Sequence, residues 1–346
     1  MKSSSDEINR KLKVAAGKNA VKVCFIDNSD CTKIIKSHSI QENRVLNKIS
    51  INGEVVTVGL EINQKNVGIA PMKVGKSKAS TFPGFCKLHD QNVFAPIENM
   101  DYSEGNIQQN FLYTLRALAK EHYLKRLTKS YYENEISDLK SKFFKKYKLQ
   151  TAMDRLSQSE YYGYLSESLI GMNDALKYLS QFRIEMLKKF EDKEYDSVET
   201  VNFTMDSQFP IAVSSLFIPD YNHSGKKIHD FGDLESPLHP LFLTIFPQGS
   251  KTYFLISYFR KHRLIYEGLK KWIDEKDLNF IETLFSNLIL VFCENFYISP
   301  DIWKKLGVSK QEEIVDIFSK NVHSSTTLLY KIPYQFNIFD YMRDFA

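Results

Sequence analysis

Three cysteines and one histidine in the first hundred residues form the pattern best suited to chemistry. Cys86 and His89 have the C-x2-H spacing of a knuckle, a tight turn that presents two metal ligands, and Cys24 with Cys31 forms a second, wider pair. Thiolates and imidazoles are the ligands of tetrahedral zinc sites. In a reducing compartment, clustered cysteines indicate a metal before a disulfide. The sequence therefore predicts a metal-stapled module over residues 24–98, with zinc bound by these four side chains.

The residues around this pattern resemble those of the zinc-stapled HNH, or His-Me finger, endonucleases. That family has a cysteine pair, a histidine on a strand, an asparagine, and then a second knuckle closely followed by a metal-binding histidine. The corresponding stretches here are Cys24, Cys31, Ser37-His38-Ser39-Ile40, Asn52-Gly53 and Phe85-Cys86-x-x-His89-Asp90. The layout also resembles uncharacterised bacterial proteins, and bacterial defence is one role we consider.

The resemblance implies a catalytic role for three residues of a ββα-like module. His38 would act as the general base on water, Asn52 would orient it, and Asp90 would hold a Mg²⁺ or Mn²⁺ ion against the scissile phosphate. The sequence departs from the family pattern at two places. Ser37 stands where the family has an aspartate or a second histidine, and Asp90 stands where it has a histidine. Because a serine is a poor ligand for a hard cation, a non-catalytic module remains an alternative, and His38 could instead be a zinc ligand.

The distribution of charge suits a polyanionic partner. Residues 1–98 carry 15 Lys and Arg against 9 Asp and Glu, and residues 108–148 carry 10 against 4. Since the whole chain is only +4, the basic surface belongs to the first half. We therefore expect this half to engage nucleic acid, with a metal-dependent nuclease as one function it would suit. The competing hypothesis is an interaction or adaptor protein, in which zinc is purely structural and a helical arm binds a protein partner.

The periodicity of apolar residues predicts an α+β fold with four segments. Residues 1–20 have no apolar period and are expected to be a flexible tail, and residues 21–100 form the zinc-binding HNH-like module. An amphipathic pattern without Gly or Pro from 106 to 161 predicts a helical arm or hairpin over 106–193. A C-terminal α+β domain is expected over 196–346.

Within these segments the predicted elements are as follows. We expect strands at 21–26 and 54–62, a loop and then a short helix from 33 to 50, and a loop from 63 to 78. Further strands are expected near 197–205, 210–218, 240–247 and 251–259, with a hairpin turn between the last two, and helices after Arg260, one of them beginning at Pro300.

Other signals are weaker. No apolar run is long enough to cross a membrane and no secretory signal is visible, so we expect a cytoplasmic protein without a membrane partner. Arg116 and His122 have the spacing of helical HEPN ribonucleases, but such spacing is common in basic helices, so we expect these residues to lie on a solvated helix face. The loop around His229 is expected to be ordinary surface. Cys293 is expected to be a buried small hydrophobe.

Overall fold

The computed structural model describes residues 21–62, 67–146, 160–230, 233, 236–321 and 332–343. The fold is α+β, as the sequence predicts, and it contains a two-stranded and a seven-stranded sheet. The predicted tail over residues 1–20 lies outside the described residues. No helix in the described part of the chain is long and apolar enough to span a membrane.

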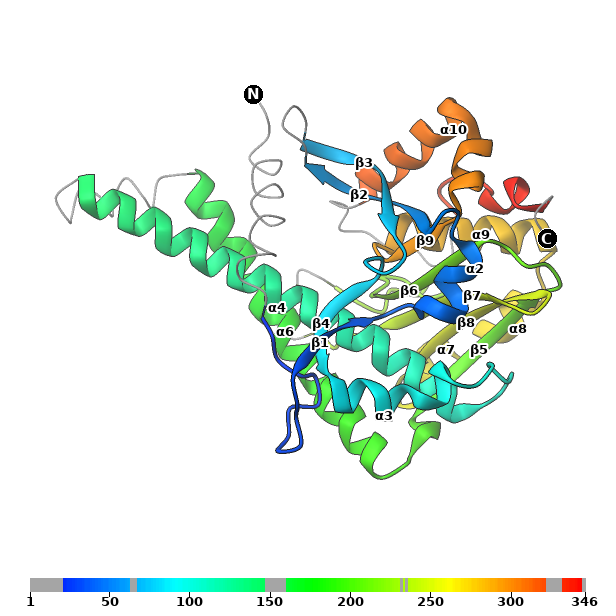
Figure 1. Ribbon diagram of the computed structural model, residues 1–346, viewed down its shortest axis with the longest axis horizontal. Helices are drawn as coiled ribbons and strands as arrows, with labels where there is room; N and C mark the ends of the chain where they lie inside the picture. The colour runs from blue at the N-terminus through cyan, green and yellow to red at the C-terminus, as the bar shows by residue number, and fades with distance from the viewer. Residues whose placement is uncertain are drawn as a thin grey trace.

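A strand-strand-helix unit begins the described chain (Figure 1). β1 (Ile34–His38) pairs antiparallel with β4 (Thr81–Cys86), and α3 (Lys87–Glu98) follows β4 directly. The sequence assigned the region of β1 to a loop, because its two isoleucines stand between lysines with no clear alternation. Pairing with β4 decides the conformation, which is a tertiary effect that local propensity does not report.

Residues 21–26, predicted to be a strand, are irregular in the structure. Their backbone is held by a hydrogen bond from the amide of Phe25 to the carbonyl of Gly84, 2.7 Å long. The short helix expected before residue 50 is present as η1 (Glu42–Leu46) and α2 (Asn47–Ile49). Val45, Leu46 and Ile49 are its buried face, as their spacing indicates.

The loop predicted over 63–78 is wrong for most of its described length. β2 (Glu54–Ile62) and β3 (Val67–Gly75) form a long antiparallel hairpin, with Glu54 opposite Gly75 and Ile62 opposite Val67. β3 is an edge strand, which explains why it tolerates Pro71: at an edge, a missing amide donor costs no ladder bond. The sequence of β3 contains glycine, proline and lysine, which are uncommon in strands, so its apolar residues showed no strand pattern.

The large sheet draws strands from both ends of the chain. Its order is β3-β2-β9-β6-β7-β8-β5, with β5 (Val198–Met205), β6 (Ile211–Phe217), β7 (Leu241–Gln248), β8 (Lys251–Phe259) and β9 (Phe296–Ile298). The four predicted strands from 197 onward are therefore confirmed. β7 and β8 are joined by the expected turn, with Gln248 opposite Lys251. Val56 of β2 pairs with Ile298 of β9, so the N-terminal hairpin continues the sheet of the C-terminal half.

Both faces of this sheet are covered. On β7, Leu241, Leu243 and Ile245 contribute to one core, whereas Phe242 faces the other side. Since successive strand residues point to opposite faces, burial on both sides requires the nearly continuous apolar run seen in the sequence. The helices that pack in the first core are mainly α9 (Leu278–Phe292) and α10 (Pro300–Asn321). α10 begins at Pro300, as predicted.

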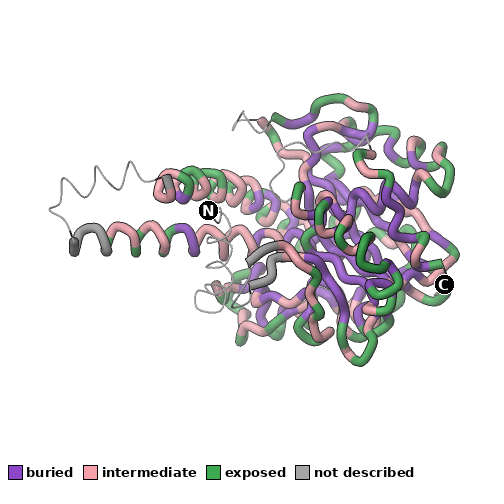
Figure 2. The backbone as a smooth tube through the Cα atoms, turned by 90° about the horizontal axis from the view of Figure 1, so that it is seen from above, coloured by how far each residue is buried: buried purple, intermediate pink, exposed green. Residues whose placement is uncertain are grey.

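Two long helices form the predicted hairpin. α4 (Ile107–Lys146) and α6 (Glu160–Glu191) run side by side, and their outer halves extend away from the body (Figures 1 and 2). The inner half of α4 packs through Phe111, Leu115 and Leu118 into the second core, which lies between the strand-strand-helix unit and the large sheet. The remaining short elements are η2 (Tyr195–Ser197), η3 (Arg260–His262), α7 (Arg263–Tyr266), α8 (Leu269–Asp274) and η4 (Ile338–Tyr341).

Candidate metal centre and adjoining polar cluster

The structure brings together the four residues predicted to bind a metal. Cys24, Cys31, Cys86 and His89 place one ligand atom each within 4.8 Å of all the others, and we call them the Cys3His cluster. The His89 Nδ1 atom lies 3.4 Å from the sulfur of Cys24, 3.6 Å from that of Cys31 and 3.2 Å from that of Cys86. Around a tetrahedral ion with ordinary zinc bond lengths, sulfur and nitrogen ligands lie about 3.5 Å apart. The cluster therefore has the donors and spacing to hold a metal ion.

The elements of the ββα unit position these ligands. Cys86 is the last residue of β4 and caps α3, so that its sulfur accepts from the His89 amide at 3.5 Å, and His89 lies in the first helical turn. The amide of Cys86 donates in turn to the sulfur of Cys24, at 3.4 Å. Amide donors around the sulfurs stabilise thiolates, the form that binds metals.

The wide gap between the first two cysteines is closed by a turn. Asp27 has a positive φ of 52°, and the amide of Cys31 donates to the carbonyl of Asn28 at 3.2 Å. Behind the turn, the guanidinium of Arg183 on α6 donates to the carbonyls of Phe25 (2.5 Å) and Ile26 (3.2 Å). The segment that carries Cys24 and Cys31 is therefore held in place by α6 as well as by its own turn.

Electrostatics distinguish the two buried thiols. Burial raises the pKa of Cys24. Burial acts in the same direction on Cys86, but the backbone amide of His89 and hydrogen bonds from Thr32 outweigh it and lower the pKa of Cys86 to about 6. A lowered pKa favours the thiolate of Cys86, the form that binds a metal.

Two of the three predicted catalytic residues lie on neighbouring elements of the unit. His38 is the last residue of β1, opposite Thr81 of β4, and Asp90 lies in the first turn of α3. His38 lies near enough to Asp90 to lower the pKa of that carboxyl, although burial has the larger, opposite effect. The Nε2 atom of His38 is buried and faces a carboxylate oxygen of Glu42 at 3.6 Å. Glu42, which the sequence analysis did not single out, is therefore the group placed to orient this imidazole.

Asn52 has a different setting. It is exposed, with a positive φ of 52°, in the two-residue turn between Ile51 and Glu54 that precedes the β2–β3 hairpin. Asparagine and Gly53 suit this turn because both accept positive φ. The position thus has a conformational reason for its residue type, independent of any role for Asn52 toward His38.

A buried arginine completes a polar cluster with the candidate catalytic residues. Arg116 of α4 is 3% exposed; it pairs with Glu98 at 2.5 Å and stacks on the ring of Phe94, 4.1 Å from the ring centre. Burial raises the pKa of Asp90, and the charge of Arg116 is the largest effect that opposes it. Sequence reasoning had treated Arg116 as a solvated residue, which is wrong. Its partners Phe94 and Glu98 come from α3, so the sequence of α4 alone gave no signal.

Four buried polar atoms in this region lack a hydrogen bond of ordinary geometry: Ser37 Oγ, His38 Nε2, Asp90 Oδ1 and Arg116 Nε, although the Ser37 hydroxyl lies close enough to Asp90 to lower its pKa. We call the four residues that carry them the polar cluster. Buried polar atoms normally have partners, so this concentration indicates a place where water or a ligand would complete the bonding.

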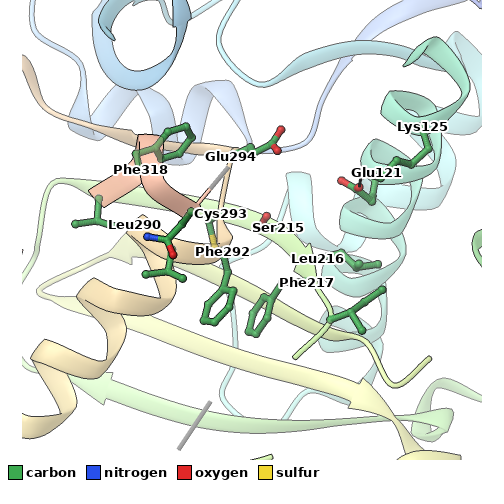
Figure 3. Close-up of a pocket in the computed structure, with 13 residues that line it drawn as sticks. Glu121, Lys125, Ser215, Leu216, Phe217, Leu290, Phe292, Cys293, Glu294 and Phe318 are labelled. Carbon is green, nitrogen blue, oxygen red and sulfur yellow. Dashed lines mark ion pairs between the residues drawn. The ribbon is translucent and has the colours of Figure 1, made fainter. Parts of the chain in front are cut away.

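A cavity that no sequence motif indicated lies between α4 and the end of α9. Its volume is about 260 Å³. Glu121 and Lys125 of α4 face Glu294 and the end of α9 across it, and the rings of Phe217 and Phe292 stack beside it (Figure 3). The predicted burial of Cys293 is confirmed, and this residue lies in the wall. The lining comes from β6, α4, α9 and α10, which no local motif could connect.

The other signals do not form sites. Arg116 is paired with Glu98, while His122 faces Ser180, 3.4 Å away on α6, so these two residues serve different contacts. Among the described residues, the Cys3His cluster is the one group of Cys, His, Asp and Glu whose donor atoms converge as a metal requires. Comparison with known proteins adds no assignment: no family model, curated protein or solved structure matches the chain.

Proposed function

We propose that the Cys3His cluster binds a structural zinc ion. Three thiolates and one imidazole form a closed set of four ligands, which leaves no open position for a substrate. The ion would join the irregular segment 21–31 to the end of β4 and the start of α3. Such an ion contributes to folding directly, because the site does not exist in the unfolded chain.

We further propose that this zinc-stapled unit engages nucleic acid and hydrolyses phosphodiester bonds. The observation that carries the proposal is the placement of His38 at the end of β1 beside Asp90 at the start of α3, within a ββα unit adjoining a metal cluster. Glu42 would orient the His38 ring, which would take a proton from water. Asp90 would bind Mg²⁺ or Mn²⁺, whose charge would stabilise the leaving oxygen.

The test combines metal analysis with a cleavage assay. Purified wild-type protein should contain about one zinc per chain, and Cys86→Ser should lose it. With Mg²⁺ or Mn²⁺ present, wild type should cleave single- or double-stranded substrates, whereas His38→Ala should keep its zinc and lose cleavage. Lys33→Ala, an exposed position just before β1, is the matched control. Cleavage that survives His38→Ala would refute the catalytic assignment.

A non-catalytic function is the second candidate, and one observation favours it. Asp90 already lies in the field of Arg116, a cation fixed by Glu98. That charge competes with a divalent ion for the single carboxylate, so the unit could serve recognition alone, with the α4–α6 arm binding a protein partner. Under this hypothesis His38→Ala leaves function intact, while Cys86→Ser disrupts the module.

A further inference from the structure

A polar groove interrupts the packing between α4 and α6. One face of each helix borders a space of about 520 Å³. Its lining consists of His122, Arg126, Lys129, Ser130 and Glu133 from α4, Leu176, Ser180 and Arg183 from α6, and Val21. The α4 residues recur at spacings of three and four, as do those of α6, so each set occupies a single helix face.

This polar seam is unusual for a helical hairpin. Toward the sheet, the two helices bury Leu118, Leu179 and Phe182 in the second core, and farther out Tyr131 packs with Leu165. Antiparallel helices normally meet through such apolar residues, because burial of apolar surface stabilises the pair. The groove beside these contacts is lined mainly by charged and hydroxyl groups, with Leu176 and Val21 as its apolar members.

The groove has an excess of positive charge. Lys129 is 3.6 Å from Glu133, whereas within the described residues Arg126 has no carboxylate partner. Arg183 is held by two backbone carbonyls. Burial, followed by the charges of Arg126 and Arg183, lowers the pKa of His122 to about 4. Like charges gathered in a concave site repel one another, and a bound anion would relieve that repulsion.

Cationic and aromatic side chains connect this groove with the candidate catalytic residues. Lys120, Tyr123, Arg126 and Lys129 follow one another at three-residue steps along α4, a distance of about 13 Å. The Lys120 ammonium donates to the carbonyl of Thr81 at 3.2 Å, and Thr81 is the cross-strand partner of His38. Tyr123 and Arg126 also line a smaller hollow at the β4 side. Because each three-residue step turns the side chain by about 60°, the series does not lie on one helix face but winds from the Thr81 side of α4 to the groove.

We infer that the groove between α4 and α6 binds the phosphate groups of a nucleic-acid strand and directs the strand toward His38. The hydroxyls of Ser130 and Ser180 and the guanidinium of Arg126 supply the donors that phosphate oxygens need. The direction of the strand rests on the proposed nuclease function, but the affinity of the groove does not, since it can be measured without cleavage.

The test is binding of fluorescein-labelled 12-nucleotide DNA and RNA to the full chain, followed by anisotropy across a salt series. The groove variant is Arg126→Glu with Lys129→Glu. The control is Arg263→Glu with Lys271→Glu, which makes the same change in net charge at exposed positions of α7 and α8. The groove variant should bind at least tenfold more weakly and lose about 2 from the salt slope, whereas the control should change affinity less than twofold.

Equal losses in both variants would show that only net charge matters and would overturn the inference, as would the absence of binding by wild type. Thermal unfolding of each variant checks that the fold is intact. Competition by pyrophosphate or a mononucleotide as strong as that by the unlabelled oligonucleotide would overturn the assignment to a strand. His38→Ala should bind like wild type, so failure of cleavage and failure of the groove give different results.

Discussion

Replacement of Arg116 by methionine tests the polar cluster most directly. The substitution keeps an unbranched apolar stem on α4 but removes a charge that is almost fully buried between Glu98 and Phe94. It deletes a stacking contact worth about 0.5 to 2 kcal/mol. It also leaves Glu98 without its ion partner, and removal of one member of a buried pair costs about 3 to 5 kcal/mol. Because Glu98 itself is partly exposed, we expect the lower end, a loss of about 3 kcal/mol in the free energy of unfolding.

The assay is urea unfolding of wild type, Arg116→Met, Glu98→Gln and the double variant. If the ion pair causes the loss, the double variant should be more stable than the sum of the single changes predicts, by about 1 to 2 kcal/mol. Glu98→Gln supplies an amide oxygen that can accept from Arg116 but leaves the guanidinium, the more buried charge of the pair, without its counter-ion, so its own cost should be comparable. A cost below about 1 kcal/mol for Arg116→Met, with additive effects in the double variant, would refute the assignment of Arg116 as a structural ion partner.

Three further outcomes follow from the same contacts. Burial raises the pKa of Asp90, so the native state disfavours the ionised carboxylate relative to the unfolded state. Asp90→Asn removes this cost and should stabilise the protein at pH 7, as measured by urea unfolding. The gain should shrink as the pH falls toward the pKa of Asp90 in the unfolded state, near 3.8. Arg183→Met removes both hydrogen bonds to the segment at Phe25 and should speed zinc release to a chromogenic chelator about tenfold, whereas an unchanged rate would mean that this anchor does not hold the site. Burial, with neighbouring positive groups, lowers the pKa of His262 to about 3. Acidification below the pKa of this residue in the unfolded state, about 6.5, should therefore reduce the free energy of unfolding by up to about 2 kcal/mol at pH 5. His262→Phe should reduce this pH-dependent loss of stability, measured by thermal unfolding at pH 7 and pH 5.

The sequence was most informative where residue identity alone defines chemistry. The Cys3His cluster could be predicted from one knuckle spacing and one loose pair, because few other uses exist for clustered cysteines in a reducing compartment. The strands β6, β7 and β8 could be predicted because burial on both faces leaves long apolar runs. The two long helices could be predicted because nothing interrupts their period.

Features that depend on contacts between distant segments could not be predicted. β1 and β3 form strands because β4 and β2 pair with them, although their own residues show no alternation. Arg116 looked solvated because the carboxylate and the ring that surround it come from α3. The pairing of Val56 with Ile298, across most of the chain, has no signal in a single sequence. The boundaries of the four predicted segments remain predictions.

The way β2 and β3 are inserted bears on how the metal site and the large sheet depend on each other. In the chain, β2 and β3 lie between β1 and β4 of the ββα unit, yet β2 pairs with β9 of the large sheet. Ser80, directly before β4, is also held in place, because its amide donates to the hydroxyl of Tyr297 on β9 at 2.7 Å. The geometry of His38 and Thr81 is therefore fixed from two sides, by the metal-binding end of β4 and by β9 at the other. Loss of zinc should displace Cys86 and His89 first, while the end of β4 near Thr81 stays anchored to the sheet. Because Asp90 directly follows His89 in the first turn of α3, loss of zinc should also separate Asp90 from His38, so the candidate catalytic pair depends on the metal.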